Sequence, residues 1–305
     1  MADRFDASKD PARDLGARER AQLINISYRL LGSLAESEDA VQEAYARWYA
    51  MPRAQQEAIR SPAAWLTTVV TRICLNQLRS ARVRRERYVG DWIPEPLPDE
   101  TEWFDVGTAD PADRVTLDES VSMAFMVVLD SMTPAERVAF ILHDVFRYPF
   151  NELAEMVGRT PAACRQLASS ARRRLQETEA PAIPGSQRAE VVRDFKRAWE
   201  AKDIDALIDL LDPDAEATAD GGGRAVTFLD PIRGREQVAR AWITIAERVS
   251  GTTTFLERTV NGQPGLVGQE NGVTVTVFAF DVVGDRVRHI WVIRNPDKLR
   301  RWTRR

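Results

Sequence analysis

Three prolines at alternate positions, Pro94, Pro96 and Pro98, constrain the fold of this chain more than any other feature. Proline lacks a backbone N–H and clashes with the preceding helical turn, so the segment cannot be a helix. The chain then stays strongly acidic to about residue 120. The sequence therefore predicts a linker over residues 91–111 between two folded parts of a 305-residue chain, which is long enough for two or three domains.

The amino-acid composition limits which disulfide, metal and cofactor sites the chain can form. Apolar residues make up 44% of the chain and charged residues 29%, so most of it should fold. The only cysteines are Cys74 and Cys164, and the only histidines are His143 and His289. These counts exclude a disulfide framework and a cysteine-rich zinc site, and a histidine site would need several carboxylates. We predict no metal and no cofactor.

The N-terminal residues contain no apolar signal core, and no run approaches about 18 apolar residues. We therefore expect a cytoplasmic protein without a membrane segment. The chain has 42 basic and 46 acidic residues, a net charge of −4. That balance argues against a uniformly cationic coat for nucleic acid, but it leaves local basic patches open.

Residues 11–90 have helical periodicity throughout. Ser37 is predicted to cap one helix, which Met51 and Pro52 end. Three polar residues share one face of this helix at spacing i, i+3 and i+4: Asp39, Gln42 and Glu43.

The next helix is predicted to begin at Ser61 and Pro62, a cap followed by proline at the first helical position. Aromatic, amide and guanidinium groups in one stripe could stack bases and hold phosphates, as single-stranded nucleic acid requires. The alternative is that the tryptophan belongs to the core and the arginines are only solvated. The stripe consists of Trp65, Thr68, Arg72, Asn76 and Arg79.

A helix-turn-helix is predicted within residues 112–178. Thr133 and Glu136 form a capping-box pattern upstream, Gly158 turns the chain, and Thr160 with Pro161 begins the last helix. That helix would span roughly 22 Å, enough to lie in a major groove. The alternative is a solvated face of an ordinary bundle. The candidate DNA-facing residues are Arg159, Arg165, Gln166, Ser169, Arg172 and Arg173.

The remainder is mixed α and β. Pro181, Pro184 and Gly185 indicate a second linker over 179–187. Within residues 188–298 we expect helices around Trp199 and from Ile204 to Leu211. Two alternating strands are expected, Val273–Phe280 and Arg286–Ile293. Residues 299–305 form a basic tail.

The motifs of the first 178 residues resemble a known family. The segments Ser37–Tyr45 and Ser61–Leu66, with the stripe that follows, resemble region two of the extracytoplasmic-function sigma factors. Thr133–Arg174 resembles region four. The resemblance implies that Asp39, Gln42 and Glu43 face the clamp helices of the largest RNA polymerase subunit, with the flap as a further contact. It also implies that the Trp65–Arg79 helix engages the melted minus-ten element and that Arg159–Arg174 bind the minus-thirty-five duplex.

The rest of the chain resembles the subgroup that carries a SnoaL-like C-terminal extension. The implied fold is multidomain: two all-α sigma domains, then an α+β cone in which helices wrap a curved sheet. The implied function of the extension is regulation in cis. Residue 224 is Arg where the subgroup has Lys, which alters the geometry of any contact. The matching residues are Trp92, Pro94, Glu95 and Pro96; Asp220, Gly221, Gly222, Gly223 and Arg224; and Asn295, Pro296, Asp297 and Lys298.

A physical hypothesis for that regulation starts from the three glycines. Their amides can form an anion-receiving turn, and Arg224 adds positive charge beside it. The acidic Pro-Glu-Pro linker would be the partner, and docking would fix the separation of the sigma domains. The alternative is that the glycines only make a tight loop.

The sequence thus predicts a sigma factor that binds core RNA polymerase and promoter DNA and performs no covalent chemistry. One rival is a sigma-like core fused to a small-molecule sensor or enzyme domain that binds an unidentified ligand, for which His289, Asp281 and Asp220 would be candidates. A lone strand histidine is more often structural. The other rival is an ordinary DNA-binding repressor, which would bind duplex DNA tightly on its own.

Overall fold

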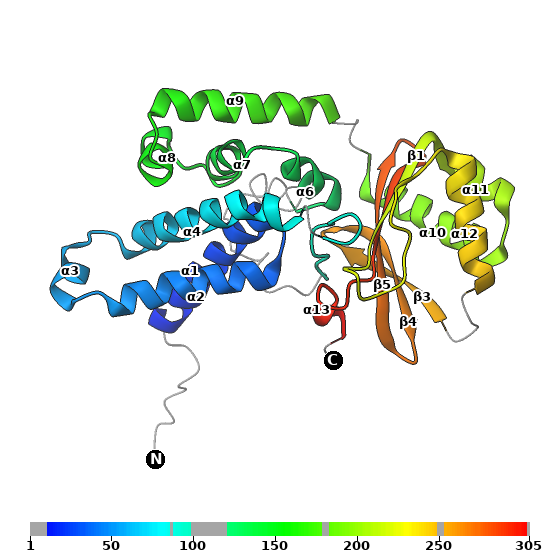
Figure 1. Ribbon diagram of the computed structural model, residues 1–305, viewed down its shortest axis with the longest axis horizontal. Coiled ribbons are helices and arrows are strands. Elements are labelled where there is room, and N and C mark those ends of the chain that lie inside the picture. Colours follow the sequence, from blue (N-terminus) through cyan, green and yellow to red (C-terminus); the bar gives the residue numbers. More distant parts are fainter. Residues whose placement is uncertain (1–10, 86–87, 99–120, 179–182, 249–252, 304–305) are drawn as a thin grey trace, which may run out of the picture. The chain divides into compact units, whose positions relative to one another are not determined.

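The computed structural model describes residues 11–85, 88–98, 121–178, 183–248 and 253–303, and within them the chain forms two compact units (Figure 1). The first contains the described residues up to Ser80 together with Met132–Arg172. The second contains residues 81–98 and 121–131 and the chain from Arg173 onward. Most of the predicted acidic linker and the segment 112–120 lie outside the described residues.

The first unit is helical, as expected. It begins with α1 (Pro11–Leu31), α2 (Leu34–Ala50), α3 (Arg53–Ala58) and α4 (Pro62–Arg85). The predicted cap at Ser37 was wrong, because Gly32 ends α1 at φ 68° and the next helix starts at once. Ser33 is the cap and accepts the amide of Glu36, whereas Ser37 lies inside α2 and donates to the Ser33 carbonyl. The predicted end at Met51 is confirmed.

The same unit continues through α7 (Pro134–Phe140), the π-helical turn η1 (Ile141–Val145), α8 (Phe150–Val157) and α9 (Pro161–Thr178). The capping box between Thr133 and Glu136 is confirmed: each accepts from the other's backbone. Arg137 is buried and donates to the Leu30 carbonyl at 2.9 Å, which ties α7 to the end of α1. Both cysteines are buried in this unit, and burial raises the pKa of Cys74 to about 12.

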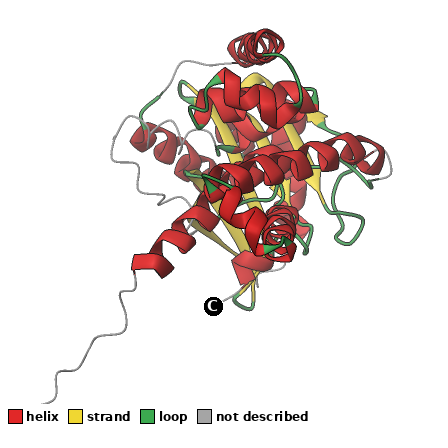
Figure 2. Cartoon of the chain, turned by 90° about the vertical axis from the view of Figure 1, so that its left-hand side faces the viewer, coloured by secondary structure: helices red, strands yellow, loops and turns green. Residues whose placement is uncertain are grey.

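The second unit is built on one mixed sheet, drawn in yellow in Figure 2. In chain order its elements are α6 (Met123–Asp130), α10 (Gly185–Ala201), α11 (Ile204–Leu210), β1 (Leu211–Asp220), β2 (Ile232–Arg233), α12 (Arg235–Arg248), β3 (Thr253–Val260), β4 (Gln263–Glu270), β5 (Val273–Val283), β6 (Arg286–Ile293) and α13 (Arg300–Thr303). The strand order is β2-β1-β6-β5-β4-β3; β1 and β6 are parallel, and the other neighbours are antiparallel.

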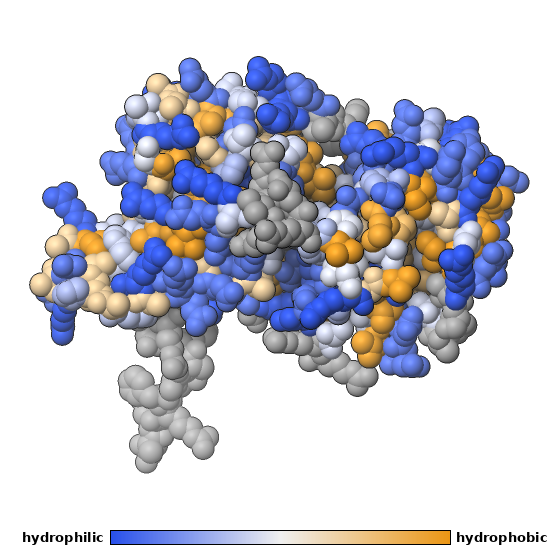
Figure 3. All heavy atoms as spheres, viewed as in Figure 1, coloured by the Kyte–Doolittle hydropathy of each residue, from blue (hydrophilic) through white to orange (hydrophobic). Residues whose placement is uncertain are grey.

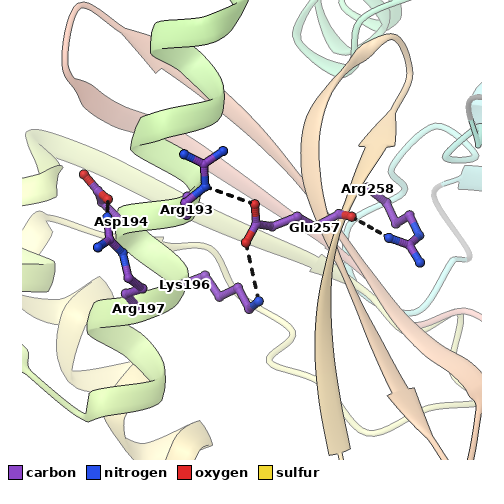
Figure 4. Close-up of polar contacts among 6 residues, drawn as sticks. All are labelled: Arg193, Asp194, Lys196, Arg197, Glu257 and Arg258. Atoms are coloured by element: carbon purple, nitrogen blue, oxygen red, sulfur yellow. Dashed lines mark hydrogen bonds and ion pairs between the residues drawn. The ribbon is translucent and has the colours of Figure 1, made fainter.

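The two faces of the sheet are covered differently. Helices α10, α11 and α12 cover one face over an aromatic core that contains Phe195, Trp199, Trp242, Phe278 and Phe280. Ion pairs also join α10 to β3, since Arg193 and Lys196 both contact the Glu257 carboxylate at 3.4 and 3.5 Å (Figure 4). The opposite face is covered by short pieces of chain: Ile93 of the linker, Met123 of α6, and Leu299 and Trp302 at the C-terminal end.

Three boundaries differ from those expected. Helix α10 begins at Gly185, inside the predicted second linker. Helix α11 ends at Leu210, before the predicted Asp212-Pro213 stop, since β1 already starts at Leu211. Pro213 lies in an irregular part of β1 before Glu216. The predicted basic tail is part of the fold, because Leu299 is buried and α13 packs on β5. The expected strands over 273–280 and 286–293 are confirmed.

No helix in the described ranges is long and apolar enough to cross a membrane.

Candidate functional site

The helix-turn-helix forms from local signals. Gly158 adopts a left-handed conformation at φ 69°, which ends α8. Thr160 then accepts the amide of Ala163 at 3.2 Å and caps α9. One side of α9 faces inward through small residues that are fully buried: Cys164, Ala168 and Ala171.

The other side of α9 is cationic and open to solvent, and hydrophilic side chains gather over the C-terminal half of the helix in Figure 3. We call Arg159, Arg165, Arg172 and Arg173 the arginine face. All four are exposed, as are the predicted partners Gln166 and Ser169. Arg165, Arg172 and Arg173 lie on α9, and Arg159 lies in the turn before it. This exposed set of guanidinium groups has the charge to contact phosphates and guanine edges in a major groove.

Two of these arginines have partners beside η1. The Nε of Arg172 donates to Oδ1 of Asp144 at 2.6 Å. The guanidinium of Arg165 lies 5.8 Å from the centre of the Phe150 ring, which itself stacks on His143 at 3.7 Å. These contacts hold both arginines against the unit that carries them.

The predicted stripe on α4 is partly engaged. Trp65 is half-buried and packs on Trp48 of α2, with ring centres 5.3 Å apart, so the expected core role applies in part. Arg72 donates to the carbonyls of Glu155 at 2.9 Å and Met156 at 3.2 Å, at the C-terminal end of α8. Asn76 and Arg79 are exposed.

The predicted polymerase-binding residues Asp39, Gln42 and Glu43 lie on the exposed face of α2. Glu43 also accepts from Arg47 one turn along. The patch is therefore an accessible polar surface that carries acidic charge.

The most complete polar site of the second unit lies where the linker crosses the sheet. Its centre is the fully buried carboxylate of Asp220 at the end of β1. Asp220 accepts from the Tyr88 hydroxyl at 2.6 Å, the Ile93 amide at 3.1 Å and the Lys298 ammonium at 2.6 Å. We call the set Tyr88, Trp92, Ile93, Leu97, Asp220, Asn261, Asn295 and Lys298 the linker site.

Lys298 is the counter-ion of this carboxylate and a clamp on the linker. The residue is only 7% exposed. Its ammonium donates to the Ile93 carbonyl and lies 4.2 Å from the centre of the Trp92 ring, a cation–π contact. A buried charge of this kind is tolerated because its hydrogen bonds and its ion pair replace water.

A second group fixes the linker at Leu97. Its amide donates to Oδ1 of Asn261 at 3.0 Å, and its carbonyl accepts the Asn261 amide at 2.9 Å. Asn261 is fully buried, and its Nδ2 also donates to the Val121 carbonyl. Further along, the Trp302 indole donates to the Pro96 carbonyl at 2.9 Å. The linker residues Ile93–Leu97 are buried as a result.

The glycine loop lies close to its neighbours. A Cβ on Gly222 would meet the Asn295 side chain at 2.3 Å, and one on Gly223 would meet Val89 at 3.3 Å. The glycines therefore permit close packing, and the anion-receiving turn for the acidic linker stays a prediction. Arg224 pairs with Asp297 at 2.7 Å on the surface, so the expected contact of Arg224 with the linker is replaced by that of Lys298.

Protonation follows the burial of the site. Burial, reinforced by the Asp220 carboxylate, raises the pKa of Tyr88 well above its ordinary value. Burial and the nearby Glu216 also raise the pKa of Asp91. Asp297 sits in solvent, and its hydrogen bond with Arg300 lowers its pKa. At neutral pH the Tyr88 hydroxyl therefore keeps the proton that it donates to Asp220.

The residues suggested for a rival enzyme or ligand site do not meet in the helix-covered core. Along β1, Ala217 and Ala219 face the helices, so the alternation points Asp220 to the other face. His289 bonds to Thr218 at 3.0 Å and stacks on Trp291, a member of that opposite face. Asp281 pairs with Arg288. Among the described residues no group of His, Cys, Asp or Glu is placed to hold a metal ion.

Several residues of the linker site carry no signal in the sequence. Tyr88, Leu97 and Asn261 belong to none of the motifs, and Asn261 with Gly262 looks like an ordinary hairpin turn. Trp302, which contacts the linker beside the site, belongs to none of them either. The same is true of Asp144 and Phe150 beside the arginine face. Their roles depend on contacts between distant parts of the chain.

Three family models match this chain. Residues 17–84 match the family described as Sigma-70 region 2, residues 122–175 match Sigma-70 region 4, and residues 192–302 match the SnoaL-like domain. The chain is 38% identical to the ECF RNA polymerase sigma factor SigJ of Mycobacterium tuberculosis, over 92% of this chain and 90% of that one. It is 33% identical to the probable ECF sigma factor SigI of the same species, over 95% of each. The crystal structure of SigJ superposes with a TM-score of 0.74 at 35% identity, covering 95% of this chain and 98% of that one.

Proposed function

Because this chain belongs to the extracytoplasmic-function sigma factors of RNA polymerase and ends in a SnoaL-like domain, we propose that its linker site regulates promoter recognition in cis. In this proposal the acidic patch of α2 binds core polymerase, α4 engages the melted minus-ten element, and the arginine face binds the minus-thirty-five duplex. The SnoaL-like domain acts as a holder of the linker and performs no covalent chemistry.

The proposal rests mainly on the hydrogen bonds that hold the buried residues 93–97 of the linker. Asp220, Lys298 and Asn261 take the amide and carbonyl groups that the prolines leave available. A segment that joins two DNA-binding regions and is held at both ends has a restricted reach. Release of these hydrogen bonds would lengthen the path between regions two and four, and so change how both fit one promoter.

The contacts of Arg72 indicate that α8 and α4 must separate before α4 binds DNA. Its guanidinium is occupied by the carbonyl end of α8, where the helix dipole favours a cation. The same guanidinium cannot hold a phosphate at the same time. In our proposal, α8 therefore leaves α4 when the protein engages melted DNA.

The packing of the SnoaL-like core supports a holding role. Large aromatic rings pack on one another between the helices and the sheet. The ligand alternative rests on one observation: the buried Trp242 indole N–H has no hydrogen-bond acceptor among the described residues. A small molecule with an acceptor oxygen would satisfy it, and a thermal shift with such a molecule would revive that alternative.

In vitro transcription with purified core polymerase tests the proposal. RNA made from fragmented genomic DNA should begin at a defined set of promoters only when the protein is present. The absence of any such start sites would overturn the sigma assignment, and tight duplex binding by the isolated protein would favour a repressor.

The regulatory part has its own variants. Trp92→Ala combined with Tyr88→Phe loosens the linker without altering the sheet, and should change transcript yield at those promoters while polymerase binding is retained. Arg224→Gln is the matched control, since the ion pair of Arg224 in the described part of the chain is with Asp297 on the surface. Equal yields from both variants would remove the linker site from regulation.

A further inference from the structure

The π-helical turn η1 lies directly behind the arginine face, and the sequence motifs assign it no function. Its backbone closes with the amide of Phe146 donating to the carbonyl of Ile141, a wider loop than an α-helix makes. Such turns are rare, and they occur often at functional sites because they redirect side chains. Here the redirected side chains are His143 and Asp144.

Asp144 contacts Arg172 through Nε and leaves the two terminal guanidinium nitrogens accessible. Only Nε of Arg172 bonds to Asp144, at 2.6 Å. The two terminal nitrogens of Arg172 have no hydrogen bond to any residue that the structure describes, and its side chain is 43% exposed. A guanine edge needs two parallel donors from a guanidinium, and the two terminal nitrogens can supply them.

The position of the Asp144 carboxylate is unfavourable for folding stability. Its side chain is 21% exposed, and its second oxygen, Oδ2, is buried without a hydrogen-bond partner in the described part of the chain. A buried, unsatisfied acceptor opposes folding. Its presence next to a DNA-facing arginine is explained if it fixes the direction of that arginine.

Arg165 is supported from the same turn by a different contact. The Phe150 ring lies under its guanidinium at 5.8 Å, and His143 of η1 also stacks on that ring at 3.7 Å. His143 is fixed in turn, because its Nδ1 lies 2.9 Å from the Tyr148 carbonyl. The two supported arginines are seven residues apart, about 10 Å along one face of α9.

We infer that Asp144, with Phe150 and His143, positions Arg172 and Arg165 for base-specific contacts with the upstream promoter element. The inference rests on the proposed function, because it requires that α9 bind that element. An arginine side chain loses rotamer entropy when it is fixed, so prior positioning favours the specific contact. It does little for contacts with phosphates, which accept many arginine orientations.

The test selects upstream elements from a randomised duplex library with holoenzyme made from full-length protein and core polymerase. Wild-type protein should enrich a motif, and Arg172→Ala should remove the preference at one position or two adjacent positions. Asp144→Asn should weaken the preference at those same positions by about twofold to fivefold, the range for a partly exposed ion pair. Phe150→Leu should weaken a different position, the one that Arg165→Ala affects.

The matched control is Glu152→Gln, an exposed carboxylate of α8 that touches no arginine of the face. It changes the charge by the same amount, so any general gain in DNA affinity should appear in both variants. If Asp144→Asn matches Glu152→Gln at every position, the pair with Arg172 is only a surface ion pair. If it sharpens the preference, Asp144 masks Arg172 and the inference is overturned. If wild-type holoenzyme enriches no motif, the proposed function itself fails.

Discussion

The linker site and the arginine face each depend on a cation, but the two cations are in opposite surroundings. Lys298 is 7% exposed and faces a carboxylate with no exposure, whereas the Arg172 side chain is 43% exposed beside Asp144. A charge inside the protein interacts strongly and must be fully paired, while a charge in water is screened and stays available. The buried pair can therefore hold one part of this chain to another, whereas the exposed arginine keeps its two terminal nitrogens available to a further partner.

The largest effect should follow from Asp220→Ala. The change leaves Lys298 buried without its counter-ion, and loss of one member of a buried pair costs about 3–5 kcal/mol. Urea denaturation should show that loss in the free energy of unfolding, and chymotrypsin should cut faster after Trp92. Asp297→Asn is the control on the surface, where the cost should stay below about 1 kcal/mol. Equal losses in the free energy of unfolding for the two variants would contradict the expected difference between buried and exposed charges.

Arg172→Ala should act on binding and leave folding alone. If the side chain contacts a guanine with two hydrogen bonds, holoenzyme should lose about 1–3 kcal/mol of affinity for its upstream element. The free energy of unfolding should change by no more than about 0.5 kcal/mol. Arg53→Ala, an exposed arginine of α3, serves as the control in the same fluorescence-anisotropy assay. A variant that lost stability and kept its affinity would place Arg172 with the structural charges.

His289 gives an intermediate case that depends on pH. Burial, assisted by Arg288, lowers the pKa of His289 to about 4 from its usual 6.5. Between these values the unfolded chain binds more protons than the folded protein, so stability should fall as pH falls from 6.5 to 4. The shift corresponds to about 3 kcal/mol at most, and partial exposure reduces this to about 1–2 kcal/mol. Thermal unfolding of His289→Gln should lack this slope; an unchanged slope would assign it to other groups.

The smallest effect is expected at the surface cluster of Figure 4. Glu257 lies between Arg193 and Lys196, but its side chain is 42% exposed and both distances exceed 3.3 Å. Glu257→Gln should therefore cost less than about 1 kcal/mol in urea denaturation. Glu270→Gln, at the exposed end of β4, is the comparison variant. A loss of several kcal/mol would mean that an exposed ion pair stabilises this protein as much as the buried pair of Asp220 and Lys298.

The two sites also differ in how far the sequence predicts them. The arginine face follows from local pattern: Gly158, Thr160 and the spacing of the arginines lie within one short segment. The motifs around Asp220 and Lys298 could be recognised by resemblance, but their partners could not. Asn261 and Leu97 are 164 residues apart, and nothing near either residue shows that they meet.

Local rules failed where the surrounding structure supplied a better alternative. Ser37 has the pattern of a cap, but the left-handed Gly32 places the start of α2 one turn earlier, at Ser33. The charge of Arg224 suggested a partner for the linker, but among the described residues Arg224 pairs with Asp297 on the surface. The buried Lys298 makes that contact, and a lysine near the end of a sequence carries no sign that it will be buried.

The proline spacing has a consequence for linker length. Ile93 and Leu97 donate their amides to acceptors at two fixed points of one sheet, and the residues at positions 94, 96 and 98 have no amide hydrogen to give. One residue inserted between Ile93 and Pro96 would bring Pro96 to the second point, and one deleted there would bring Pro98. Either change places a proline, which has no amide hydrogen, opposite the Asn261 acceptor. The spacing between the two hydrogen bonds therefore fixes the length of this segment. The two donors must therefore stay four positions apart in the sequence.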